Sequence, residues 1–245
     1  MPRQRKAENL EETTPRKPRQ RKREVGGVNN LRLKAITPLS RKQDDMIQAY
    51  EQGLHVIASG AAGGGKGYIA LFLALRSVLQ KMQDKIIIIR TAVSCRPQGY
   101  MPGNIVEKEE IYSLPYKQII NDLFDSGTAY DELLKKRIIE FTTTSYLRGL
   151  TFDNAIVFFD EFQNASQEEI ETVLTRLGQN SKVIFAGDLR QSDLYRSRDV
   201  SGFNWLINLT EGKVLKKYFK HIKFTFDDCV RSEFVKNVLM AIDMS

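Results

Sequence analysis

Residues 60–66 have the types and spacing of a site that binds phosphate. The stretch reads Gly60, Ala61, Ala62, Gly63, Gly64, Gly65, Lys66, and is followed by Gly67 and Tyr68. Its spacing fits the phosphate-binding loop G-x-x-x-x-G-K. Glycines let backbone N–H groups turn into one concavity, and the start of a following helix adds a partial positive charge. We therefore expect residues 60–68 to hold the phosphates of a nucleotide, with Lys66 on the outer ones.

Gly67 departs from this pattern. Ser or Thr normally follows the lysine and gives its hydroxyl to Mg²⁺. With glycine there, water would have to fill that place. A glycine-rich turn that binds nothing is the alternative, but the position between an apolar run and a helical segment favours phosphate binding. Hydrolysis is the step that the missing hydroxyl puts in question.

Two carboxylates supply the second half of such a site. Asp160 and Glu161 end an apolar run at residues 156–159. Neighbouring residues at a strand end point to different sides, so the two acids can take different tasks. We expect Asp160 to hold Mg²⁺ through water and Glu161 to polarise the attacking water.

Three further residues have weaker individual signals. Gln191 follows another apolar run and could sense the γ-phosphate through its amide. Arg231 follows the last predicted strand and could neutralise transferred charge, in its own subunit or in a neighbour. Gln43 lies upstream of the loop, and its amide can both donate to and accept from an adenine edge. Taken singly, Arg231 is more often a surface residue or a salt-bridge partner, and most surface glutamines in the position of Gln43 do not contact a base.

Two loops combine arginine with an aromatic residue, as proteins that bind single-stranded nucleic acid do. Residues 91–102 contain Arg96 and Tyr100, and residues 142–149 contain Thr143, Tyr146 and Arg148. We expect arginine and hydroxyl groups to contact phosphate and the rings to stack on bases. A packed loop and a helix cap are the ordinary structural alternatives.

Secondary-structure patterns indicate how these residues are positioned. Continuous apolar runs predict strands at 85–90, 155–159 and 182–186, with shorter candidates at 138–142 and 222–226. Helical segments are expected at 41–51 after an N-cap at Ser40, and at 67–82, 109–124, 166–177 and 232–242. This alternation predicts one α/β domain, a doubly wound and mostly parallel sheet with helices on both faces.

Composition sets the remaining bounds. The net charge is +7, and residues 1–27 hold nine Lys/Arg against four Glu, so +5 of it lies there. We expect 1–28 to be a disordered basic tail, either solvated or holding phosphate, before a folded domain at 29–245. The sequence shows no membrane-length apolar run and no apolar signal core, and its two cysteines, Cys95 and Cys229, suit a reducing cytoplasm.

Taken in order, the motifs resemble the PhoH family of P-loop proteins, whose core is similar to that of superfamily-one helicases. The resemblance runs from about residue 39 to about residue 240 and rests on G-A-A-G-G-G-K, G-Y-M-P-G, Y-L-R-G-L-T-F-D-N-A, D-E-F-Q-N-A-S, G-D-L-R-Q and F-T-F-D-D-C-V-R. It implies ATP and Mg²⁺ as cofactors, a RecA-like core without a second motor domain, and assembly into a ring, with a hexamer favoured. It also implies RNA-related activity.

By residue, the resemblance gives Lys66 the phosphate contact, Asp160 the Mg²⁺ contact and Glu161 the catalytic carboxylate. Gln191 matches the glutamine of the G-D-x-x-Q motif that acts as the sensor. Arg231 matches the arginine after F-T-F-D-D, and Gln43 matches a glutamine that lies near adenine. The loop departs from the family pattern at Ala61, Gly64 and Gly67.

We therefore expect an ATPase whose nucleotide state moves loops that bind single-stranded nucleic acid, RNA rather than DNA. A catalytically silent nucleotide-binding assembly protein is the alternative, motivated by Gly67. A small-molecule kinase would need an arginine-rich lid, for which the sequence offers no clear candidate.

Overall fold

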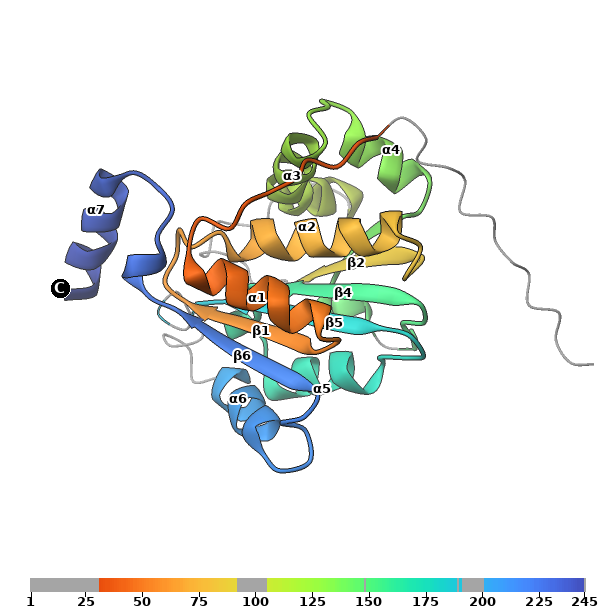
Figure 1. Cartoon of the computed structure of the whole chain (residues 1–245). Coiled ribbons are helices and arrows are strands. Elements are labelled where there is room, and N and C mark those ends of the chain that lie inside the picture. The colour runs from red at the N-terminus through yellow and green to blue at the C-terminus, as the bar shows by residue number, and fades with distance from the viewer. Residues whose placement is uncertain (1–30, 92–104, 148, 189, 191–200, 245) are drawn as a thin grey trace, which may run out of the picture.

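The chain folds around one parallel sheet with helices on both faces (Figure 1). The computed structural model describes residues 31–91, 105–147, 149–188, 190 and 201–244. Its six strands lie in the order β3-β2-β4-β5-β1-β6, and every pair of neighbours is parallel. In chain order they are β1 (His55–Gly60), β2 (Lys85–Arg90), β3 (Ile139–Thr143), β4 (Ala155–Asp160), β5 (Lys182–Gly187) and β6 (Phe219–Phe224).

Burial on both faces explains the long apolar runs of the central strands. In β2, Ile86 and Ile88 pack into one core, whereas Ile87 and Ile89 pack into the other. Successive side chains of a strand point to opposite faces, so a strand covered on both sides must be apolar throughout. The first core is covered by α1 (Arg41–Glu51), α2 (Lys66–Leu79), α3 (Ile105–Leu123) and α4 (Ala129–Lys135), and the second by α5 (Gln167–Thr175) and α6 (Phe203–Glu211).

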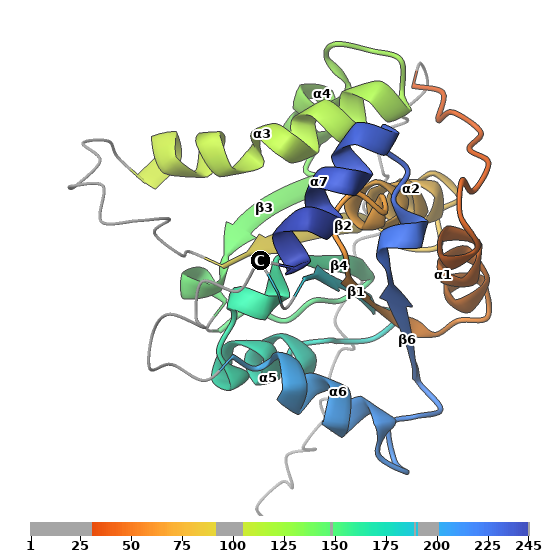
Figure 2. The same ribbon diagram turned by 90° about the vertical axis from the view of Figure 1, so that its left-hand side faces the viewer.

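The last helix, α7 (Glu233–Met244), stands apart from both layers (Figures 1 and 2). It has no buried residue, and Phe234 is 75% exposed. Its contacts run instead to the segment after β6, to the loop after β1 and to Arg190, which follows β5. Asp243 accepts from Arg190, and Leu239 lies near Gly63.

The predicted fold class is confirmed, and most predicted elements are present with shifted ends. Strand 222–226 is found at 219–224, because Thr225 begins a capped turn in which Asp228 accepts from its backbone N–H. Strand 138–142 is found at 139–143. Helix 41–51 has the predicted bounds, with the Ser40 hydroxyl accepting from Gln43 N. Helices α4 and α6 were not predicted, and the tail at 1–28 lies outside the described residues.

Candidate nucleotide-binding site

The loop between β1 and α2 requires glycine at particular positions. Gly60 has φ +101°, and a Cβ there would overlap the carbonyl oxygen of Phe224 on the neighbouring strand. Gly65 has φ +77°, and its Cβ would lie 2.7 Å from Gln43 Nε2. Both conformations disfavour other residues, and both positions lack the space for a side chain. The local sequence thus fixes a tight turn directly before the first turn of α2.

Lys66 begins α2 and folds back over its own loop. Its Nζ donates to Gly60 O at 2.7 Å and to Ala61 O at 2.8 Å. Burial lowers the pKa of Lys66, and the nearby carboxylates, Asp188 foremost, oppose that shift. Two carbonyl oxygens occupy two of the three ammonium donors, so the third remains for a ligand.

Gly67 has room for the side chain that it lacks. A Cβ built there meets only Phe158 Cζ, at 3.7 Å, which is an ordinary van der Waals distance. Its φ is not positive. Glycine at this position is therefore not required by the backbone, unlike Gly60 and Gly65.

Asp160 ends β4 beside the loop and is held by a residue that the sequence did not single out. Tyr116, on α3, donates its hydroxyl to Asp160 Oδ2 at 2.9 Å. The tyrosine is only 2% exposed, and its ring packs edge-on against Phe158. Burial, followed by the charge of Glu161, raises the pKa of Asp160 to about 6. The hydrogen bond from Tyr116 acts in the opposite direction and favours the carboxylate.

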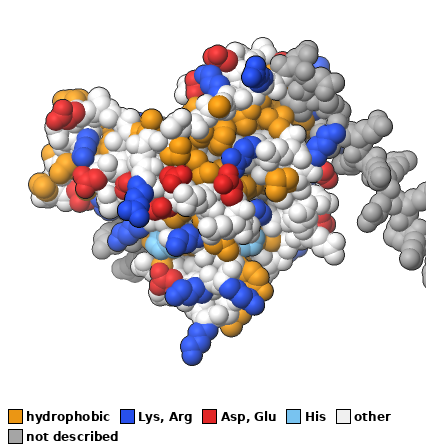
Figure 3. All heavy atoms as spheres, viewed as in Figure 1, with side chains coloured by type: hydrophobic (Ala, Val, Ile, Leu, Met, Phe, Trp, Pro, Cys, Tyr) orange, Lys and Arg blue, Asp and Glu red, His pale blue; other side chains and the backbone are white. Residues whose placement is uncertain are grey.

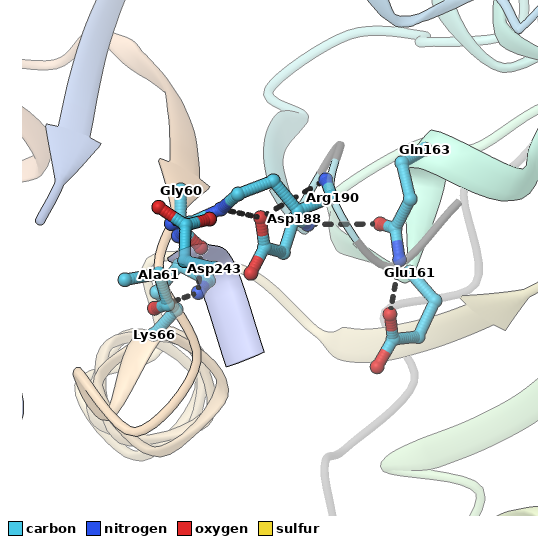
Figure 4. Close-up of polar contacts among 8 residues, drawn as sticks. All are labelled: Gly60, Ala61, Lys66, Glu161, Gln163, Asp188, Arg190 and Asp243. Carbon is cyan, nitrogen blue, oxygen red and sulfur yellow. Dashed lines mark hydrogen bonds and ion pairs between the residues drawn. The ribbon is translucent and has the colours of Figure 1, made fainter. Parts of the chain in front are cut away.

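Glu161 follows in the left-handed conformation, with φ +52°. Figure 4 shows the chain of contacts that begins there. The Gln163 amide donates to Glu161 Oε2 and accepts from the backbone N–H of Asp188 at 3.1 Å. Asp188 in turn accepts from Arg190 Nε at 3.2 Å, and Arg190 donates to Asp243 at 3.1 Å. This network links Glu161, directly after β4, to the residues after β5 and to α7.

A cleft of about 770 Å³ brings these parts together. Ten of the residues predicted to bind the nucleotide or act in catalysis line it: Gln43, Ala62, Gly63, Gly65, Lys66, Gly67, Tyr68, Asp160, Glu161 and Arg231. The predicted residues Gly60, Ala61 and Gly64 form the back of the loop and do not line the cleft. Its remaining wall is mostly apolar and includes Ile36, Leu39, Ile119 and Val230. Of these apolar residues only Val230 lies within a motif, F-T-F-D-D-C-V-R, and the other three had none.

Gln43 and Arg231 reach the cleft from opposite ends of the chain. Gln43 is buried, and its amide accepts from Leu39 N at 2.8 Å and donates to Gly64 O at 3.0 Å. It therefore fixes the phosphate loop, and one donor and one lone pair remain for a base. Arg231 is exposed and follows Val230, whose N–H donates to Gly63 O at 3.0 Å.

Of the residues predicted to contact nucleic acid, the structure describes only Thr143 and Tyr146. Tyr146 is 49% exposed in a short helical turn after β3, whereas Thr143 is buried and offers a ligand little surface. Arg96, Tyr100, Arg148 and the predicted sensor Gln191 lie outside the described residues. The idea that both loops bind a strand of nucleic acid thus stays a prediction.

Comparison with known proteins matches a sequence model of the family described as "PhoH-like protein" to residues 35–243. The chain belongs to the PhoH-like family. It is 31% identical to the protein PhoH of Escherichia coli K12 over 229 residues, which cover 89% of this chain and 63% of that one. It is 34% identical to a PhoH-like protein of Bacillus subtilis over 168 residues, 68% of this chain and 52% of that one. This PhoH-like chain therefore spans about half to two thirds of the length of these curated relatives.

Solved structures resemble the PhoH-like chain more distantly. The large terminase of a thermophilic bacteriophage is 12% identical, with a TM-score of 0.49 over 82% of this chain and 50% of that one. The SWI2/SNF2 ATPase core of Sulfolobus solfataricus is 10% identical, with a TM-score of 0.45 over 80% and 46%. The parallel sheet and the loop between β1 and α2 themselves define a P-loop NTPase fold. Within the described part of the chain, no helix is both long enough and apolar enough to cross a membrane.

Proposed function

We propose that this PhoH-like protein binds ATP with Mg²⁺ and hydrolyses it. One observation carries the proposal: a single cleft joins the phosphate loop, Lys66, and the two acids Asp160 and Glu161. The donor set fits the ligand, because inward-turned amides and an ammonium suit a triphosphate, and Mg²⁺ is bound by one or two carboxylates together with phosphates. Adenine would lie against the apolar wall formed by Ile36, Leu39 and Val230.

Each residue has a task in this proposal. Lys66 contacts the outer phosphates with its remaining donor, and Asp160 holds Mg²⁺ directly or through water. Bound Mg²⁺ would neutralise charge on the phosphates. Glu161, whose carboxylate is held by the Gln163 amide, orients and polarises the attacking water. Arg231 neutralises the transferred phosphate, and Gln191 senses it.

Steady-state phosphate release tests the proposal, with Lys66→Ala as the inactive reference and the exposed Lys81→Ala as the matched control. We expect release by the wild type and by Lys81→Ala, and none above background from Lys66→Ala. Equal background rates for all three proteins, together with retained binding of a fluorescent ATP analogue, would establish the silent nucleotide-binding protein that Gly67 suggests.

Coupling to single-stranded nucleic acid, RNA rather than DNA, is the second part of the proposal. It is supported by the half-exposed Tyr146 after β3 and by the basic charge of the chain. Filter binding with Arg96→Ala and Arg148→Ala tests it. We expect weaker binding of single-stranded RNA by both variants, and unchanged affinity would argue against these loops.

Self-association into a ring, with six subunits favoured, and a cytoplasmic location complete the proposal. Phe234, Val238 and Ile242 are spaced four residues apart on α7 and are all exposed, which forms an apolar stripe suited to a second copy. Light scattering should give a multiple of the chain mass for the wild type and a smaller mass for Phe234→Asp/Val238→Asp. A monomeric wild type would contradict the ring.

A further inference from the structure

Five exposed lysines lie close together in the sequence around β6, and we call them the β6 lysine strip. They are Lys213, Lys216, Lys217, Lys220 and Lys223. None has a carboxylate partner among the described residues. Glu211 is the only acid between residues 211 and 223, and it faces His221 at 3.9 Å. Figure 3 shows Lys and Arg side chains gathered over this lower part of the molecule.

The strip begins at the end of the sheet opposite the nucleotide cleft. β6 runs parallel to β1, and its last residue, Phe224, pairs with Gly60 at the start of the phosphate loop. Lys213, Lys216 and Lys217 precede the first residue of β6, so they lie at the far end of that strand. The three turn lysines are therefore separate from the cleft and from the loops that follow β2 and β3, whereas Lys223, which pairs with Ser59, lies near the phosphate loop.

Protection of an exposed sheet edge explains only part of the strip. β6 is an edge strand, and lysines on such strands prevent pairing with other chains. That accounts for Lys220 and Lys223. It does not account for the three lysines of the preceding turn, which have no strand edge to protect.

The turn also presents an aromatic ring among these charges. Tyr218 is 49% exposed, and Lys217 Nζ lies 4.9 Å from the centre of its ring. Two backbone hydrogen bonds fix the tyrosine, since its N–H donates to Leu215 O at 2.9 Å and its carbonyl accepts from His55 N at 2.8 Å. A half-exposed ring on a hydrogen-bonded backbone, beside lysines without carboxylate partners, is an arrangement suited to hold a single strand by base stacking and phosphate contact.

We propose that the β6 lysine strip is a second contact surface for single-stranded nucleic acid, which it binds through phosphates while Tyr218 stacks on a base. The inference rests on the nucleic-acid part of the proposed function. An acidic protein would also meet the positive charge, but Tyr218 favours a ligand with flat, stackable bases. Because the three turn lysines are remote from the cleft, their contribution is the same with and without bound nucleotide.

Counterion release gives the size of the effect. Each phosphate contact with a single strand adds about 0.7 to the slope of log affinity against log salt. Losing three contacts should lower that slope by about 2, which corresponds to about 100-fold weaker binding at about 0.1 M salt and to little change near 1 M.

The experiment compares two triple variants of the full chain that remove the same charge. Lys213→Gln/Lys216→Gln/Lys217→Gln removes the turn lysines, and Lys81→Gln/Lys135→Gln/Arg137→Gln is the control, since these three residues are also exposed and unpaired among the described residues. A fluorescein-labelled uridine homopolymer is titrated at several salt concentrations, with and without an ATP analogue. Phosphate release and thermal unfolding are measured on the same preparations to verify that each variant is folded.

We expect the slope of log affinity against log salt to fall in the turn variant only, by the same amount with and without the ATP analogue. Phosphate release by this variant should equal that of the wild type. Tyr218→Leu should weaken binding about 5-fold or more and leave the slope unchanged. Equal slopes for the two triple variants would overturn the inference and leave the proposed function standing. A wild type that hydrolyses ATP but never binds the homopolymer would overturn both the inference and the nucleic-acid part of that function.

Discussion

Replacing Tyr116 by phenylalanine removes the hydroxyl that holds Asp160 and leaves the ring in place. That hydroxyl donates to Asp160 Oδ2 at 2.9 Å. A hydrogen bond to a charged group contributes about 1.5–3 kcal/mol, and a pKa change of one corresponds to about 1.4 kcal/mol. Because the bond favours the ionised acid, its loss should raise the pKa of Asp160 from about 6 to about 7 or 8.

Mg²⁺ binds the carboxylate and not the acid, which fixes the sign of the pH dependence. In the wild type, Mg²⁺-dependent binding of a fluorescent ATP analogue should strengthen as the pH rises through about 6. In Tyr116→Phe the same rise should come at about pH 7 to 8, with equal affinities for both proteins well above it.

Tyr50→Phe is the matched control, because its hydroxyl is also buried and is hydrogen-bonded to Ser77 at 2.9 Å, and Ser77, unlike Asp160, does not line the cleft. It should titrate like the wild type. Coincident pH profiles for Tyr116→Phe and the wild type would refute the idea that Tyr116 controls Asp160.

Three further substitutions test the loop and the acid network. The serine of Gly67→Ser has room beside Phe158. It should strengthen Mg²⁺-dependent nucleotide binding by up to about 30-fold, because a fixed hydroxyl replaces an immobilised water. Isothermal titration with and without Mg²⁺ measures this change. Gly60→Ala should lower the free energy of unfolding by about 2 kcal/mol or more, because its Cβ overlaps the backbone of Phe224; urea denaturation checks it. Gln163→Leu leaves the buried N–H of Asp188 without that partner and should cost about 1–3 kcal/mol in the same assay.

The sequence was sufficient for features that depend on local pattern. The run of four isoleucines in β2 predicts a strand covered on both faces, and the loop spacing predicts the turn before α2. Adjacent acids after an apolar run predict the end of β4. In each case the signal lies within a few residues, so no knowledge of the tertiary structure is needed.

Other features depend on contacts between distant residues and left no such signal. Tyr116 is 44 residues from Asp160 and lies on a helix whose pattern shows only that one face is buried. Arg190 is 53 residues from Asp243. The edge strand β6 was misplaced because lysines interrupt its apolar pattern, so only Ile222 and Phe224 are buried.

The electrostatics of the acid pair argue against an idle site. Asp160 would titrate near 3.8 in an unfolded chain and titrates at about 6 in the fold. When folding raises the pKa of a carboxyl group, the folded state loses stability as the pH rises from the unfolded pKa through the folded pKa. For Asp160 this loss is about 3 kcal/mol at neutral pH. That loss disappears as the pH falls below about 4. The charge of Glu161 is one cause of this shift, and a bound cation would offset it by favouring the carboxylate form of Asp160. A cleft that keeps a costly acid opposite a phosphate loop, with a tyrosine directed at that acid, fits the proposed metal-bound phosphate, and Gly67 would change how firmly that metal is held.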